Sequence, residues 1–237
     1  MIKDKVSIVL PTYNERDNIL NLIRALEKAI KNPEIIVVDD NSPDKTWKLV
    51  KNLKKKNIKI IRRMKEKGLA SAIAHGVSKA KGDIIIWMDC DLSQPPETTI
   101  RLINALKNAD ISVGSRYVKG GLDKRKFIRI FTSRLFNMFA AFLLNLKVKD
   151  TDSGFIAVKK HIFKKVSIYE HGYGEYFIKF IYDAQRKGFK IVEIPYANQD
   201  RIKGESKTGE SLIGLLKQGY NYITGVIKIR LNILKYK

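Results

Sequence analysis

Asp89 and Asp91, two residues apart, are the side chains best suited to chemistry in this sequence. They follow the apolar run 84–88, and alternation along an extended segment points both carboxylates to one side and Cys90 to the other. Adjacent carboxylates repel each other unless a cation lies between them. Hard oxygen ligands suit Mg²⁺ or Mn²⁺, which keep open positions for substrate phosphates. A pair of solvated acids is the alternative, and we expect Cys90 to pack in the core rather than to bind metal.

Two other polar segments also follow apolar runs. In Pro-Thr-Tyr-Asn-Glu at 11–15, the ring of Tyr13 could pack on a base while Glu15 accepts hydrogen bonds from a base or ribose. A turn before a helix, with Asn14 as the cap and Glu15 favouring the helix dipole, explains the same residues. The segment 39–44, Asp-Asp-Asn-Ser-Pro-Asp, is equally ambiguous because Asn-Ser-Pro-Asp is a good turn and cap sequence.

Strands and helices alternate in the first half of the chain. The strands are continuous apolar runs, which is typical of a parallel sheet covered by helices on both faces. Ligands of such sheets bind beyond the carboxyl ends of the strands, where the polar segments lie. The expected strands are 6–10, 35–38, 58–61, 84–88 and 111–113, and the expected helices are 18–30, 46–53, 69–80 and 98–106.

The second half is less regular. It predicts a long helix at 127–146, a strand at 155–158, a helix at 176–186, a strand at 191–194 and one or two amphipathic helices within 211–237. We expect a catalytic domain over 1–207 and a C-terminal amphipathic helical extension over 208–237.

The charge balance indicates an anionic partner. The chain of 237 residues has 46 Lys and Arg against 24 Asp and Glu, a net charge of +22. Nucleic acid, an acidic membrane or a phosphorylated substrate would fit. We expect no nucleic-acid partner, because no recognition-helix pattern, RNP-like motif or zinc spacing is present. The single cysteine favours a reducing, cytoplasmic location. The longest uncharged apolar stretch, 135–146, is shorter than the roughly 20 residues that span a bilayer, so no transmembrane span is expected.

The order of the motifs carries a resemblance. Pro-Thr-Tyr-Asn-Glu at 11–15, Asp-Asp-Asn-Ser-Pro-Asp at 39–44, Lys-Gly-Leu at 67–69 and Asp-Cys-Asp-Leu at 89–92 are followed by Gly-Ser-Arg-Tyr at 114–117, Asp-Ser-Gly-Phe at 152–155 and Gly-Glu-Ser-Lys at 204–207. This series, from residue 6 to about 207, resembles the family 2 glycosyltransferases of the GT-A fold. It is most similar to the polyprenyl-phosphate sugar synthases, among them the dolichyl-phosphate mannose synthases.

The resemblance implies a role for each motif. Arg201 and Lys207 would close over the donor diphosphate and stabilise the leaving group. Ser93 stands where some relatives have a metal-binding Gln, Gln94 stands where His is frequent, and Ile156 where Arg is frequent. The implied catalytic residues are Asp91, Arg116, Arg201 and Lys207; the nucleotide-sugar contacts are Pro11, Tyr13, Glu15, Val38, Asp40, Asp89, Cys90 and Asp91; and the metal ligands for Mn²⁺ or Mg²⁺ are Asp89, Asp91 and Ser93.

The implied reaction is inverting transfer of a hexose to a polyprenyl or dolichyl phosphate, with mannose from GDP-mannose as the default donor. A phosphate monoester needs no general base, because its second pKa of about 6 leaves it ionised, but it needs cations to hold it. The segment 115–134 contains seven basic residues and only one acidic residue, Asp123. Arg129 and Ser133 lie four residues apart in this segment and therefore on one face of the expected helix. The acceptor-phosphate contacts are predicted to be Arg116, Arg129 and Ser133. UDP-glucose or another donor, or a glycan or glycolipid hydroxyl with Asp152 as base, is the alternative.

A lipid acceptor requires a route to the bilayer. A basic amphipathic helix can lie in the headgroup plane, so we expect peripheral binding to an anionic membrane on its cytoplasmic face. Packing onto the sheet or a second subunit is the alternative. The predicted membrane-facing residues are Phe131, Leu135, Phe136, Phe139, Phe142 and Leu143 in the long helix, and Leu212, Leu215, Leu216, Ile223, Val226 and Ile227 near the C-terminus, where Lys217, Lys228, Arg230, Lys235 and Lys237 are interspersed.

Overall fold

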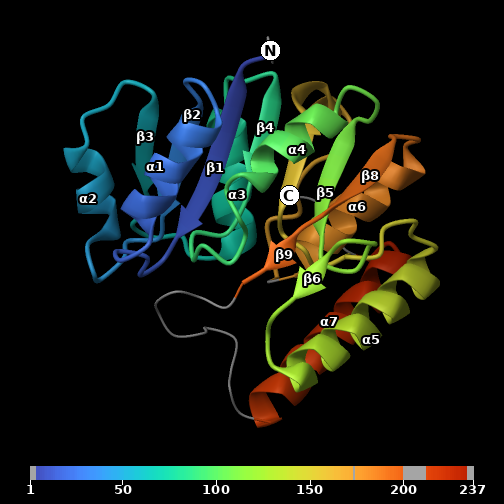
Figure 1. The fold of residues 1–237 in the computed structure, drawn as a ribbon. Helices are drawn as coiled ribbons and strands as arrows, with labels where there is room; N and C mark the ends of the chain where they lie inside the picture. The colour runs from blue at the N-terminus through green and yellow to red at the C-terminus, as the bar shows by residue number, and fades with distance from the viewer. Residues whose placement is uncertain (1–3, 173, 200–211, 234–237) are drawn as a thin grey trace.

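Seven strands form one sheet in the order β3-β2-β1-β4-β7-β5-β8 (Figure 1). The computed structural model describes residues 4–172, 174–199 and 212–233. The boundary predicted at residue 207 lies outside these ranges. The strands are β1 (Val6–Thr12), β2 (Glu34–Asp39), β3 (Ile58–Arg62), β4 (Ile84–Trp87), β5 (Ile111–Ser115), β7 (Ile156–Lys159) and β8 (Ile191–Pro195).

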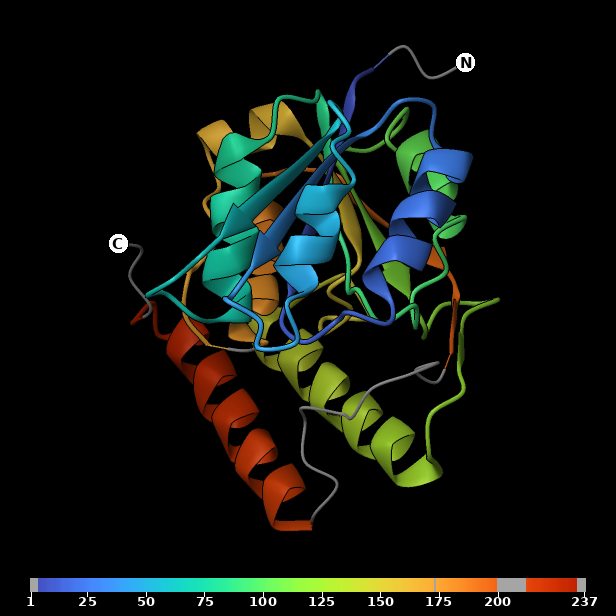
Figure 2. The same ribbon diagram turned by 90° about the vertical axis from the view of Figure 1, so that its left-hand side faces the viewer.

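The central strands are buried on both sides, as their continuous apolar runs predict. Side chains of β1 alternate between two cores, with Ile8 and Leu10 in one and Val9 in the other. Parallel pairing of β1 with β2 sets Thr12 opposite Asp39, so their polar ends meet at one edge. The two helical layers cover opposite faces of this sheet (Figure 2). The helices of these layers are α1 (Ile19–Ala29), α2 (Thr46–Asn52), α3 (Leu69–Lys79), α4 (Thr98–Ala105) and α6 (Glu175–Arg186), and the 3₁₀ helix η1 is Lys160–Lys164.

One strand departs from the parallel pattern. β7 pairs antiparallel with both β4 and β5, with Ile156 opposite Trp87 and Val113. Its start therefore lies where β4 and β5 finish. As a result, the loop 150–154 before β7 joins the polar segments after β1, β2 and β4 at the same edge. The expected mostly parallel α/β fold is confirmed, with β7 as its antiparallel member.

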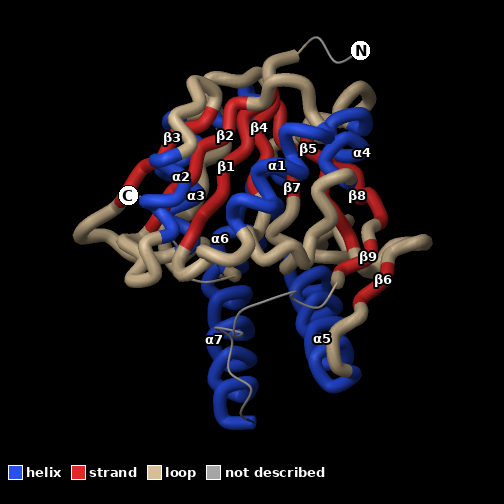
Figure 3. Tube along the Cα trace, turned by 60° about the vertical axis from the view of Figure 1, so that its left-hand side comes forward, coloured by secondary structure: helices blue, strands red, loops and turns tan. Residues whose placement is uncertain are grey.

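Two long helices extend beyond the end of the sheet at which the parallel strands finish (Figure 3). They are α5 (Phe127–Leu144) and α7 (Leu212–Arg230), and they pack side by side through Ala140 and Val226. α5 ends at Asn145, whose left-handed φ of 50° stops the helix. The short parallel pair β6 (Leu122–Asp123) and β9 (Ala197–Asn198) lies beside the start of α5.

This packing corrects the predicted membrane-facing set. Val226 is fully buried against α5 and α6. Phe139 and Leu143 pack against the same cluster, and Phe136 stacks on Tyr222 of α7 with ring centroids 5.3 Å apart. Sequence periodicity placed these residues on one outer face because it does not show which part of an apolar helix meets a second helix.

Candidate active site

The acidic motif lies in a bend immediately after β4. The strand ends at Trp87 and the chain bends at 90–92, with Leu92 in the left-handed region at φ 62°. The motif is therefore not the extended segment that the sequence predicted. Asp91 is buried and its Oδ1 accepts the backbone N–H of Ser93 at 3.0 Å, whereas Asp89 is half-buried.

Gln94, the residue that replaces a frequent His, organises this bend. Its Oε1 accepts the backbone N–H of Asp89 at 2.9 Å. Its Nε2 donates to Asp89 Oδ2 at 3.3 Å and to the carbonyl oxygen of Ser153 at 3.2 Å. Gln94 thus joins the acidic bend to the loop 150–154. The sequence shows the departure from the family pattern at this position but does not predict this contact.

Cys90 packs in the core, as the residue pattern predicts. It is buried and its Sγ donates to the carbonyl oxygen of Pro11 at 3.3 Å. This contact holds the acidic bend against the segment after β1. The assignment of Cys90 to the donor site stays a prediction.

The acids suit a metal that a substrate helps to bind. Within the described ranges, no group of three or more His, Cys, Asp or Glu side chains is placed to hold an ion. Mg²⁺ commonly uses only one or two carboxylates together with substrate phosphates. Asp89 and Asp91 fit that donor set. Ser93 is half-buried in the same bend, and its predicted ligand role stays a prediction.

Hydrogen bonds from backbone N–H groups join the segment after β1 to the segment after β2. Three consecutive N–H groups donate to side chains of the second segment: Asn14 to Ser42 (3.1 Å), Glu15 to Thr46 (3.0 Å) and Arg16 to Asp44 (3.0 Å). Asn14 adopts φ 58° and lies outside α1, which corrects the alternative that it caps the helix. Tyr13 and Glu15 are half-buried in this fixed loop, beside the half-buried Pro11.

Asp40 is part of a buried ion pair. Its Oδ1 lies 2.5 Å from Nη2 of Arg63, and its Oδ2 accepts the backbone N–H of Gly68 at 2.8 Å. Asp40 therefore positions the Lys-Gly-Leu segment as well as the predicted base pocket. Val38 is fully buried between the sheet and α3, where it packs near Gly76, so its side chain does not reach the surface.

Arg116 forms a second buried pair. Its Nε and Nη2 donate to the two oxygens of Asp150 at 2.8 and 2.6 Å, and its backbone N–H also donates to Asp150. Arg116 is 6% exposed and Asp150 is 0% exposed. Burial acts to lower the pKa of Arg116, but the charge and hydrogen bonds of Asp150 outweigh it and hold the pKa well above its usual value. The pair fixes the loop 150–154, a role that the sequence did not predict.

Ser133 and Arg129 lie on α5, one turn apart. The hydroxyl of Tyr117 donates to Ser133 Oγ at 2.9 Å, which ties this turn to the end of β5. Among the seven predicted cations, Arg125 pairs with Asp123 at 2.6 Å and Arg134 lies over the Tyr117 ring at 5.5 Å. The arrangement gathers cations beside Arg129 and Ser133, whose role as acceptor contacts stays a prediction. Arg201 and Lys207 lie outside the described residues.

Asp152 is the exposed member of the loop 150–154, between buried Thr151 and buried Ser153. Desolvation by the surrounding protein raises the pKa of Asp152 to about 6. The charge of Arg116 opposes the shift, and those of Asp150 and Glu175 add to it. Such a carboxylate could take up a proton near neutral pH.

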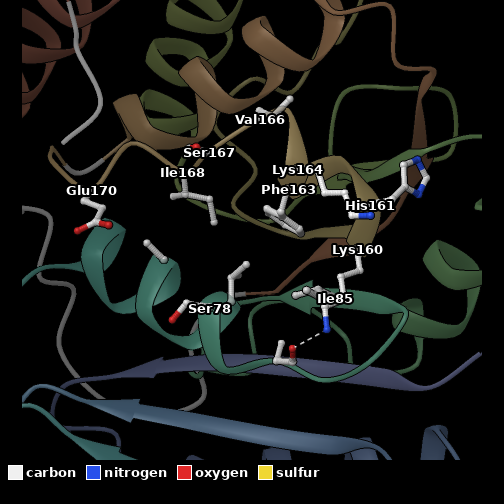
Figure 4. A pocket seen from close by; sticks show the side chains of 13 residues that line it. Ser78, Ile85, Lys160, His161, Phe163, Lys164, Val166, Ser167, Ile168 and Glu170 are labelled. Atoms are coloured by element: carbon white, nitrogen blue, oxygen red, sulfur yellow. Dashed lines mark hydrogen bonds between the residues drawn. The ribbon is translucent and has the colours of Figure 1, made fainter.

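A separate cavity of about 720 Å³ lies between α3 and the segment 160–170 (Figure 4). Val77, Ile85 and Ile168 line it, with Lys160 and Lys164 at its border. None of the predicted site residues within the described ranges lines this cavity.

α5 is long and apolar enough to cross a membrane, as judged by length and composition within the described residues, and 17% of it is buried. The expectation of no transmembrane span counted only uncharged runs, and it stays a prediction. The helix reaches 18 residues because it includes Arg129 and Arg134. Length and composition also fit a helix that lies on a surface.

Known proteins match this chain in sequence and in fold. It is 41% identical over 226 residues to the dolichol-phosphate mannosyltransferase of Pyrococcus furiosus, which covers 91% of this chain and 63% of that protein. It is 31% identical to the polyprenol monophosphomannose synthase of Mycolicibacterium smegmatis, over 87% of this chain and 82% of that protein. The glucosyl-3-phosphoglycerate synthase of Mycobacterium tuberculosis, solved with Mn²⁺ and UDP, has the same fold, with a TM-score of 0.74, 16% identity and coverage of 96% and 79% of the two chains.

The family assignment rests on the first two thirds of the chain, where β1, β2 and β4 bring the predicted motifs to one edge. Residues 7–167 match the family described as "Glycosyl transferase family 2", which confirms the resemblance read from the motif order and the GT-A type of fold. The chain belongs to glycosyl transferase family 2.

Proposed function

We propose that this protein transfers a hexose from a nucleotide sugar to a polyprenyl phosphate, with inversion, at the cytoplasmic face of a membrane. The observation that carries the proposal is the meeting of three features at one edge of the sheet: the acids after β4, the loop 150–154 with Arg116, and the polar turn of α5 at Ser133. The names of the Pyrococcus and Mycolicibacterium relatives support a mannose donor and a polyprenyl-phosphate acceptor.

The donor would lie between the segments after β1, β2 and β4. Tyr13 and Glu15 would contact the nucleoside, and Asp89 and Asp91 would face the diphosphate. A bound Mn²⁺ or Mg²⁺ would supply charge for the departing diphosphate. Relatives in fold were crystallised with Mn²⁺ or Mg²⁺ and UDP, which supports a divalent ion but not the choice of GDP-mannose.

The acceptor would lie across the acidic bend from the donor, between the loop 150–154 and α5. Arg129 and Ser133 would bind the phosphate, while Asp150 holds Arg116 in place next to them. The phosphate oxygen is already ionised, so Asp152 would not serve as its base. A hydroxyl acceptor is the second candidate, and the raised pKa of Asp152 favours it, because a base needs a pKa near the working pH.

α5 offers a surface for the lipid. A stripe of exposed apolar side chains runs along it at helical spacing: Phe127 (81% exposed), Phe131, Leu135, Met138 and Phe142 (86% exposed). α7 and the residues after it add Ile223, Ile227, Leu231 and Ile233. Because Ser133 and Asn137 of α5 bond to the α/β body in the middle of the helix, we propose that α5 lies on the membrane rather than crossing it.

The test is a transfer assay in which a polyprenyl phosphate and a free sugar acceptor are offered in separate reactions. The protein is incubated with Mn²⁺, polyprenyl phosphate and each labelled nucleotide sugar, and the label in the organic phase is counted. We expect label from GDP-mannose, with UDP-glucose as the second candidate. Asp152→Asn should retain transfer to the lipid phosphate. Transfer to a free sugar acceptor that Asp152→Asn abolishes would instead favour the hydroxyl-acceptor reaction. No label from any donor would refute the proposal.

A further inference from the structure

The loop 150–154 is anchored from several elements while one side chain projects from it. Asp150 is held by Arg116, and its backbone N–H donates to Glu193 of β8 at 3.0 Å. Ser153 Oγ donates to the carbonyl oxygen of Gly114, and its own carbonyl accepts from Gln94. Asp152 alone among residues 150–153 is exposed. The loop therefore presents Asp152 at a position fixed by its neighbours.

The remaining anchor, Thr151, is held entirely from the two long helices. Asn137 of α5 accepts the backbone N–H of Thr151 at 2.5 Å and its hydroxyl at 2.8 Å, both at Oδ1. Tyr222 of α7 places its hydroxyl 3.0 Å from Thr151 Oγ1. Asn137 and Thr151 are almost completely buried. Residues 14 and 71 positions away in the chain thus fix one threonine of the loop 150–154.

The direction of these hydrogen bonds follows from the donor inventory. An amide oxygen only accepts, so the single hydroxyl proton of Thr151 is donated to Asn137. The proton between Tyr222 and Thr151 must then come from Tyr222. Burial raises the pKa of Tyr222, and the nearby charge of Asp152 raises it further, so the phenol keeps this proton. Asn137 Nδ2 donates onward to the carbonyl oxygen of Ser133 at 2.7 Å.

The hydrogen bonds of Thr151 lead to residues that lie next to the exposed apolar side chains of α5 and α7. Met138 follows Asn137 on α5 and is exposed, as are Leu135 before it and Ile223 after Tyr222. α5 and α7 contact each other close to these residues, through Ala140 and Leu144 of α5 and Val226 and Ile229 of α7. A small rotation of either helix on binding lipid would move a direct anchor of the loop.

We propose that Asn137 and Tyr222 are positioning residues that couple the seating of α5 and α7 on lipid to the placement of the loop 150–154 and, through Asp150, of Arg116 beside the acceptor. This inference rests on the proposed function for its lipid. It assigns Tyr222 no contact with substrate. Its hydroxyl acts through Thr151.

Tyr222→Phe tests the coupling, because it removes one hydroxyl and keeps the ring that stacks on Phe136. Tyr220→Phe on the same helix is the matched control, since Tyr220 is exposed. We expect Tyr222→Phe to lower kcat for the lipid acceptor about tenfold, or about 1.4 kcal/mol, with the KM for the nucleotide sugar and the melting temperature close to wild type. Thr151→Val removes the hydroxyl bonds to both Asn137 and Tyr222, so it should lower kcat at least as much, and adding Tyr222→Phe to it should cause no further loss.

Hydrogen exchange gives a readout that does not depend on transfer. Vesicles containing polyprenyl phosphate should slow exchange in the loop 150–154 of the wild type and of Tyr220→Phe, and slow it less in Tyr222→Phe. If transfer occurs and Tyr222→Phe equals Tyr220→Phe in both measurements, the coupling is refuted. If no transfer occurs but vesicles slow exchange through Tyr222, the coupling stands and the proposed reaction fails.

Discussion

Asp150→Asn should destabilise the protein because it breaks a fully buried ion pair. Removing one partner of such a pair costs about 3–5 kcal/mol, since the other charge stays buried and uncompensated. Asp150 is 0% exposed and contacts Arg116 through both carboxylate oxygens. Asparagine keeps one acceptor oxygen, so we expect the lower bound, about 3 kcal/mol. For a chain of 237 residues this lowers the melting temperature by about 6–12 °C.

Thermal unfolding followed by circular dichroism measures this effect. Glu27→Gln is the matched control, because its pair with Lys55 has the same N···O distance of 2.6 Å but side chains 22% and 45% exposed. An exposed pair contributes below about 1 kcal/mol, so this variant should melt close to wild type. Equal melting of Asp150→Asn, Glu27→Gln and wild type would mean that the Arg116 pair does not hold the loop.

Three further predictions address the metal, the loop carboxylate and the lipid surface. Asp89→Asn combined with Asp91→Asn, or a chelator, should abolish transfer; wild-type turnover would exclude the metal site. The folded pKa of Asp152 is raised, so its protonated form favours folding below the unfolded pKa and this contribution is lost as pH rises through about 6. Asp152→Asn should therefore melt above wild type at pH 7–8 and converge with it near pH 4, and an unchanged difference across pH would contradict the shift. Phe142→Asp should weaken vesicle binding about tenfold or more, because burying Phe contributes about 1.5–3 kcal/mol, whereas the exposed Met64→Asp, away from α5, should not.

The strands and most helices could be predicted because their signal is local. The run 35–38 predicts β2 because four consecutive apolar residues between polar ones are typical of a short strand buried on both faces, and all four are buried. The direction of β7 could not be predicted in the same way. Its apolar residues at 156–158 fit a parallel or an antiparallel neighbour, and the choice depends on the path of the chain through α5.

The site residues likewise divide into those that a local signal predicts and those whose partners lie far away in the chain. Asp89 and Asp91 were found because their place after a strand is a local property. The partners of the charged groups were not found, because Asp150 lies 34 residues from Arg116 and Arg63 lies 23 residues from Asp40. Read singly, each of these side chains looks available to a ligand. In the structure these side chains form ion pairs, and each pair also holds a loop in place.

Asn137 shows which signal could have revealed the scaffold. A polar residue within the apolar run 135–146 interrupts a surface otherwise suited to lipid, and burying its amide without partners would cost about 1–3 kcal/mol. The sequence therefore required partners for it, although it did not name them. The structure supplies these partners from the loop 150–154 and from Ser133, so the polar residue that interrupts the apolar surface of α5 attaches this helix to the site.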